Sequence, residues 1–122
     1  MKKTRLVIHS LSTWEHPKLR VWQPADPTTF AETITAAIGH RTRAGSDDFS
    51  LKVATPKGLA TMPARAGIIA TRPLLVMERY DYDELWQWCE ETLARCDGAD
   101  WKECVEKLRL YFTWEYENYT EQ

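Results

Sequence analysis

The hydrophobic pattern of the chain changes its period near residue 80. The run Leu74-Leu75-Val76-Met77 is apolar without alternation, which is typical of a strand covered on both faces. From Leu85 onward, apolar residues recur at helical spacing. The pattern predicts a central strand that leads directly into an amphipathic helix. The outer face of that helix is acidic and carries Asp83, Glu84, Gln87, Glu90 and Glu91.

Three earlier segments also have a period. Residues 4–11 are rich in β-branched side chains and predict a first strand. In residues 26–38, an Asp-Pro pair is a typical helix start, and Gly39 supplies a stop. Residues 49–54 alternate apolar with polar side chains, which predicts a half-exposed strand. The apolar stripe of the expected helix at 27–38 is Phe30, Ile34, Ala37 and Ile38.

Two further capping signals predict helices. Thr55-Pro56 pairs a capping residue with a proline at the first helical position and predicts a short helix through Met62. Asp100 and Glu103 form an Asp-x-x-Glu start that is similar to a capping box. Apolar residues recur at helical spacing over 101–112, so we predict a helix there.

Other segments are less regular. Residues 12–24 place Trp14 and Trp22 among basic residues, a composition that can serve nucleic-acid stacking. No matching motif accompanies them, and we favour a covering loop whose tryptophans pack on the core. Ile68 and Ile69 are candidates for an early start of the strand at 74–77, interrupted by Pro73. Residues 113–119 alternate aromatic with acidic side chains and fit either an edge strand or an ordered tail.

The predicted order of elements is β-α-β-α-β-α-α, and residues 113–119 are assigned neither to a strand nor to a tail. With 122 residues, the chain is long enough for one domain and too short for two, so we expect a single domain over 1–122. The expected fold class is α+β: a small mixed sheet of three to four strands with two longer helices and one short helix packed on it. Trp88, Trp101 and Trp114 are assigned to core packing.

Charge is distributed unevenly along the chain. Residues 1–77 carry 11 Lys/Arg and 5 Asp/Glu, whereas residues 78–122 carry 5 and 13. This asymmetry indicates a partner with a basic surface. The alternative is that the two halves interleave in the fold and give a mixed field.

The sequence offers no credible catalytic set. It contains no phosphate-binding loop, dinucleotide fingerprint or Gly-x-Ser-x-Gly elbow. Cys89, Cys96 and Cys104 lack the close pairs of a zinc site, so we expect buried structural thiols, no metal site and no cofactor. The chain has no apolar stretch long enough for a signal peptide or a membrane span, and we expect it to be cytoplasmic.

Several motifs together resemble one family. These are Asp26-Pro27-x-x-Phe30, Phe49 with Thr55-Pro56-x-x-Leu59, Tyr80-x-Tyr82-Asp83, Trp101 with Lys107-Leu108, and Trp114-Glu115-Tyr116-Glu117. Their order and spacing resemble the polymorphic-toxin immunity family catalogued as immunity protein eight, over roughly residues 4–119. The resemblance implies a small α+β protein, encoded beside a toxin, that binds the toxin domain and blocks it without catalysis.

The expected partner is therefore a cognate toxin C-terminal domain, bound 1:1, with no nucleic acid or membrane as partner. A nuclease toxin with a basic cleft is the favoured kind, because an acidic surface steers toward such a cleft. Candidate partner-binding residues are the acidic helix face, aromatic anchors beside it, and the acidic tail: Tyr80, Tyr82, Asp83, Glu84, Trp86, Gln87, Glu90, Glu91, Glu115 and Glu117.

Two other readings fit the same surface. A general intracellular interaction adaptor would show the same acidic and aromatic residues. A small metal-dependent enzyme would use the paired carboxylates, such as Asp81 with Asp83, as ligands or as acid and base.

Overall fold

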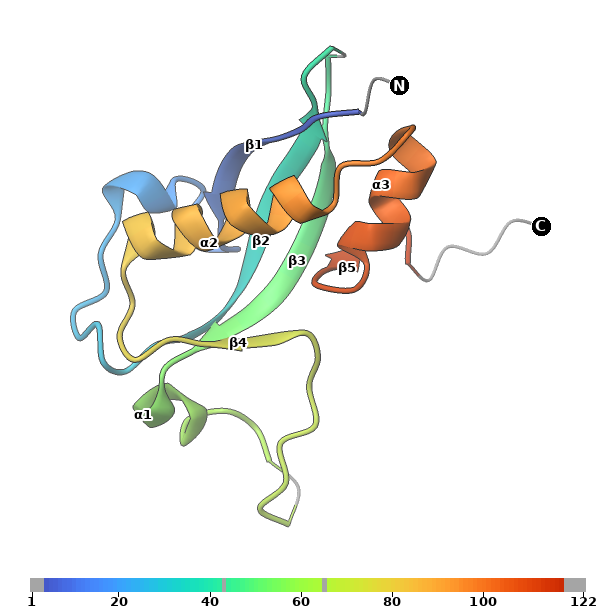
Figure 1. Cartoon of the computed structure of the whole chain (residues 1–122). Helices are drawn as coiled ribbons and strands as arrows, with labels where there is room; N and C mark the ends of the chain where they lie inside the picture. Colours follow the sequence, from blue (N-terminus) through green and yellow to red (C-terminus); the bar gives the residue numbers. More distant parts are fainter. Residues whose placement is uncertain (1–3, 43, 65, 118–122) are drawn as a thin grey trace.

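The computed structural model describes residues 4–42, 44–64 and 66–117. Figure 1 shows the elements in chain order: β1 (Leu6–Ser12), the 3-10 helix η1 (Leu19–Val21), β2 (Ala31–His40), β3 (Asp47–Ala54), α1 (Pro56–Leu59), β4 (Leu74–Val76), α2 (Tyr82–Arg95), α3 (Trp101–Leu108) and β5 (Thr113–Trp114). This arrangement confirms the predicted α+β class with a mixed sheet and two longer helices.

The sheet has five strands and is mostly antiparallel, with β3 at its centre. β1, β2 and β3 form an antiparallel meander, in which Ala31 pairs with Ala54 and Ile38 with Asp47. β4 runs parallel to β3 opposite Lys52–Ala54, and β5 runs antiparallel opposite Phe49 and Ser50. These two short strands therefore share the far edge of β3, one after the other.

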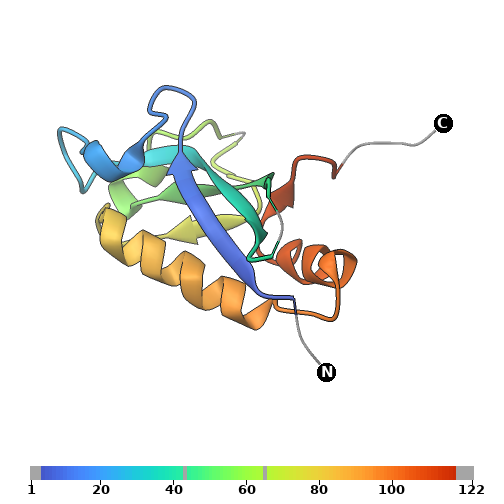
Figure 2. The same ribbon diagram turned by 90° about the horizontal axis from the view of Figure 1, so that it is seen from above.

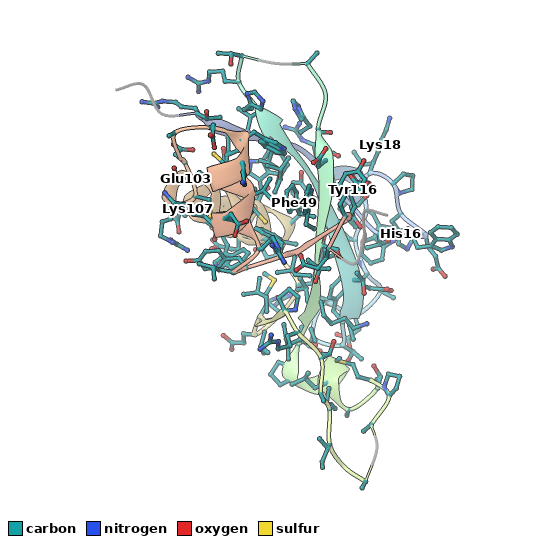
Figure 3. All side chains as sticks on the ribbon, turned by 90° about the vertical axis from the view of Figure 1, so that its right-hand side faces the viewer. His16, Lys18, Phe49, Glu103, Lys107 and Tyr116 are labelled. Atoms are coloured by element: carbon teal, nitrogen blue, oxygen red, sulfur yellow. The ribbon has the colours of Figure 1, made fainter. Side chains whose placement is uncertain are left out.

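α2 and α3 cover one face of the sheet (Figure 2). Side chains alternate across a strand, so β2 and β3 each send every second residue into the core beneath these helices. Phe49 is one of them and lies between the sheet and α3 in Figure 3. The buried core includes Ile34, Ala36 and Ile38 of β2, Phe49, Leu51 and Val53 of β3, Leu85, Cys89 and Leu93 of α2, and Val105 and Leu108 of α3. Trp88, Trp101 and Trp114 pack against this core, as expected.

The helix predicted at 27–38 is wrong, because this segment forms β2. Asp26 accepts hydrogen bonds from the Thr28 amide at 2.9 Å and from the Thr28 and Thr29 hydroxyls at 2.7 and 3.0 Å. This is a turn that uses the same acceptor as a helix cap. Ile34 and Ile38 fit a period of two through Ala36 as well as a helical period, and the β-branched residues here favour a strand.

The central position predicted for residues 74–77 is also wrong. β4 is a three-residue edge strand, and the side chains of Leu74 and Val76 are 39% and 49% exposed. Only one face of this apolar run is covered, where Leu75 and Met77 pack against the core. Ile68 and Ile69 belong to no strand of the described chain, and Ile68 is 64% exposed.

The helix starts predicted at Thr55 and Asp100 are confirmed by their caps, and Asp81 caps α2 in the same way. Thr55 accepts from the Gly58 amide at 3.1 Å, Asp81 from Glu84 at 3.2 Å and Asp100 from Glu103 at 2.8 Å. α1 and α3 are shorter than expected and end at Leu59 and Leu108. Residues 113 and 114 form a strand, whereas residues 118 and 119 lie outside the described residues.

Candidate functional site

α2 exposes the acidic face that its periodicity predicts. The helix contains four carboxylates and one basic residue, Arg95. Asp83 and Glu84 lie in its first turn, and Glu90 and Glu91 lie about two turns later. All four carboxylates and the amide of Gln87 are exposed, while the opposite face buries Leu85, Cys89, Thr92 and Leu93. The sequence therefore located this surface correctly.

The carboxylates of α2 have no ion pair within the described part of the chain. The two ion pairs recorded there join Lys107 to Glu103 and Arg109 to Glu117. On α2 itself, Glu91 accepts a hydrogen bond from Gln87 at 3.1 Å. The negative charge of the helix is consequently available to a partner.

The basic and acidic halves of the sequence meet beside the C-terminal half of α2. A hollow of about 290 Å³ lies between α2 and β1 and is lined by Arg5 and Arg41 together with Glu90. The charges line one hollow without forming an ion pair. The field around Glu90 is therefore mixed, whereas Glu84 and Glu91 lie outside this hollow.

Tyr80 is placed differently from the expected surface anchor. Its side chain is 6% exposed, and its ring stacks on Phe30 with centroids 4.5 Å apart and meets Trp22 edge-on at 5.8 Å. The hydroxyl is buried and has no hydrogen-bond partner among the described residues. Burial is the main cause that raises the pKa of Tyr80 to about 12. Tyr80 is thus a core residue.

Tyr82 and Trp86 lie one turn apart on α2 and retain part of their surface. Their rings stack with centroids 6.0 Å apart, and both side chains pack partly on the core. Burial also raises the pKa of Tyr82, so its hydroxyl stays protonated and can donate a hydrogen bond at neutral pH. This pair remains compatible with a role as aromatic anchors.

A hollow of about 580 Å³ lies between η1 and the start of α2. Its lining includes Arg20, Trp22 and Tyr82 together with the carboxylates of Asp81 and Asp83. Both signs of charge and two aromatic faces meet here, so the hollow suits a polar or charged side chain better than an apolar one. Sequence reasoning missed it because η1 is remote from α2 in the chain.

The tail carboxylates are engaged within the protein. Glu115 accepts the Asp48 amide at 2.9 Å, and its own amide donates to the Asp48 carbonyl at 2.9 Å. Glu117 pairs with Arg109, whose side-chain hydrogen bonds hold the pKa of that carboxyl below its usual range. These contacts fasten the tail to β3 and α3, which is a structural use of both residues.

Trp14 is the residue whose placement departs furthest from expectation. Its side chain is 99% exposed and does not pack on the core, whereas Trp22 does. A tight turn presents it, since the Thr13 amide donates to the His16 carbonyl at 2.9 Å and the His16 amide to the Thr13 hydroxyl at 3.0 Å. Figure 3 shows His16 and Lys18 of this loop on the opposite side of the sheet from α3. The only sequence signal was the lack of apolar neighbours at any regular spacing.

The cysteines are buried and free, as expected. Burial raises the pKa of the Cys89 thiol to about 12 and of Cys96 to about 11, so neither is a reactive thiolate at neutral pH. Among the described residues, no group of three or more His, Cys, Asp or Glu side chains could hold a metal ion. In the same residues, no helix is both long and apolar enough to cross a membrane.

A family model described as Immunity protein 8 matches residues 6–119. No curated protein and no solved structure matched the chain.

Proposed function

The chain belongs to the Immunity protein 8 family, and from that premise we propose that it blocks its cognate toxin domain with the exposed acidic face of α2. Family membership implies neutralisation of a cognate toxin by a protein that is not a catalyst. The proposal adds the surface, a 1:1 complex formed by a single domain over 1–122, and a toxin whose contact surface is basic.

The observation that supports this surface most is the unpaired charge of α2. Four exposed carboxylates lie on one helix and have no ion pair among the described residues, so contact with a basic partner would replace no existing pair. Complementary charge mainly accelerates association and selects the partner, while desolvated aromatic anchors slow dissociation. Tyr82 and Trp86 are the anchors that this geometry offers.

A nuclease is the toxin class that such a surface fits best. A nuclease binds phosphates through a basic cleft, and an acidic helix laid against that cleft competes for the same Lys and Arg side chains. Binding beside the cleft would also exclude nucleic acid by repulsion between like charges.

The first experiment tests neutralisation itself. The C-terminal domain encoded by the open reading frame immediately upstream is expressed in susceptible cells with and without this protein, and survivors are counted. Rescue together with a co-purifying complex is the expected result. Toxicity without rescue or without a complex contradicts the proposed function.

The second experiment tests the face. Glu84→Lys with Glu91→Lys is expected to slow association with the toxin domain about tenfold at low salt, with a smaller effect at high salt. The matched control is Glu15→Lys with Glu106→Lys, which changes the net charge equally at exposed sites outside α2. A folded α2 variant that associates as fast as the wild type would falsify the assignment.

A further inference from the structure

β4 leaves one edge of the sheet open. The Pro73 carbonyl accepts from the Lys52 amide at 3.0 Å, and the Met77 amide donates to the Ala54 carbonyl at 2.9 Å, so these groups face β3. Main-chain groups of successive strand residues point to opposite sides. The N–H and C=O groups of Leu74 and Val76 therefore face away from β3, and no partner is recorded for them in the described chain.

This edge lacks most of the usual protection against pairing. Natural edge strands are commonly guarded by their shortness or by charged side chains, prolines or bulges, and β4 itself has only the first of these. β4 has the sequence Leu-Leu-Val, and Leu74 and Val76 are 39% and 49% exposed. At the opposite edge of the sheet, β1 carries a register break between Ile8 and Ser10. β4 is thus the more receptive edge.

A hollow of about 370 Å³ lies beside this edge, between β4 and α2. Its apolar lining includes Leu75, Met77 and Trp88, which are partly buried, and Leu85 of α2. Its charged lining consists of Glu78, Asp81, Glu84 and Arg79, three carboxylates and one guanidinium. Such a lining suits a side chain with an apolar stem and a positive end.

We propose that an extended segment of the toxin domain adds to β4 as a further strand and places one Lys or Arg side chain in this hollow. The inference rests on the proposed function and names how the partner is held. Added strands bind through main-chain hydrogen bonds, and pockets for alternate side chains supply specificity. The hollow lies on the side of β4 toward which Leu75 points, where alternate side chains of an added strand would also point. Glu84 belongs both to the hollow and to the acidic face of α2, so one partner can contact both.

The direct test is hydrogen–deuterium exchange on the wild-type protein, alone and with the upstream-encoded toxin domain. We expect the amides of Leu74 and Val76 to exchange at least tenfold more slowly in the complex, because an added strand would accept from them. A stable complex in which both amides exchange as in the free protein overturns strand addition and leaves the proposed function intact. Failure of the two proteins to associate overturns both proposals.

Two variants of the edge provide a second readout. Val76→Pro removes one outward N–H while keeping the Met77 bond to β3, and Val76→Lys adds a positive charge where a basic strand would dock. Each is expected to weaken the complex at least tenfold, about 1.4 kcal/mol. The control is Leu110→Lys, the same kind of change at a 77% exposed apolar residue beyond α3.

The melting temperature of each variant shows whether the fold is kept. If Val76→Pro fails to fold, Val76→Lys and the wild-type exchange data still decide the question. Unchanged affinity of folded Val76→Lys, with Leu110→Lys equally unaffected, contradicts the proposal. Protection of Leu74 and Val76 that grows with protein concentration in the absence of toxin would assign the edge to a second copy of this chain and overturn the proposal.

Discussion

Arg109 and Glu117 form a bidentate ion pair that connects the end of the described chain to the C-terminal cap of α3. Nη2 of Arg109 lies 2.6 Å from Oε1 of Glu117, and Nε lies 3.0 Å from both carboxylate oxygens. The same carboxylate accepts the Trp114 amide at 3.4 Å. The pair therefore stabilises the turn that follows β5. The Glu117 carboxylate is ion-paired within the free protein.

Arg109→Ala should raise the pKa of Glu117, because the side-chain hydrogen bonds from Arg109 are the largest cause of its depression. A depressed carboxyl pKa stabilises the fold above the ordinary carboxyl range, and this contribution is lost as the pH falls through the folded-state pKa. The stability difference between wild type and variant should therefore be present at neutral pH and vanish in acid. Side-chain NMR titration of Glu117 gives the pKa, with Lys102→Ala on the exposed side of α3 as the control. An unchanged Glu117 titration would argue against the pair in solution.

Thr55 offers a test of the junction between β3 and α1, where it also contacts the residues just before β2. Its buried hydroxyl donates to the Thr28 carbonyl at 2.6 Å and accepts from the amides of Phe30 and Gly58 at 3.0 and 3.1 Å. Thr55→Ala removes the cap and takes the acceptor from two buried amides, those of Phe30 and Gly58, so the free energy of unfolding should fall by about 2–3 kcal/mol. Thr55→Ser keeps the hydroxyl and should cost about 1 kcal/mol for the lost methyl. Urea unfolding compares the two, and equal losses would show that the hydroxyl contributes little.

Tyr80→Phe should leave the free energy of unfolding equal or slightly higher at neutral pH and should increase it at alkaline pH. The hydroxyl is buried without a partner among the described residues, so its removal leaves no broken hydrogen bond. Because folding raises the pKa of Tyr80 to about 12, the protonated hydroxyl contributes to the free energy of unfolding below pH 10, and this contribution is lost as the pH rises toward 12. The Phe variant should unfold at equal or higher urea than the wild type at pH 7, and its advantage should grow between pH 10 and 12. The buried thiols are common to both proteins and cancel in this difference. A variant that is clearly weaker at pH 7 would indicate a hydroxyl partner.

The sequence predicted those elements whose signals are local. The start of α3 was readable because Asp100 caps the amide three residues later, and the exposed face of α2 followed from its period. Asp26 shows the limit of such signals. Its carboxylate receives the Thr28 amide just as a capping residue would, yet the chain enters a strand. Tertiary pairing with β1 and β3 decided between two local interpretations.

The features of the candidate site that escaped prediction all depend on distant partners. Tyr80 is buried because Phe30 and Trp22 stack on it. Glu117 is occupied because Arg109 lies opposite it at the end of α3. β4 lies at the edge because no other strand of the described chain pairs with its outer side, and no property of the run 74–77 alone could show this. Periodicity identifies which side chains face solvent from one helix, but not which are used by another element.

The division of the far side of β3 between β4 and β5 has a consequence for how this protein can diversify. The meander β1–β2–β3 and the two long helices supply most of the buried core, whereas β4 and β5 are short and reach it only through the partly buried Leu75 and Trp114. Substitutions at Leu74 or Val76 alter side chains that are largely outside the core, so they should cost little in folding free energy. The sheet thus separates a scaffold that is constrained by packing from an edge whose side chains can be substituted, so a change of binding specificity at this edge does not require a change of fold.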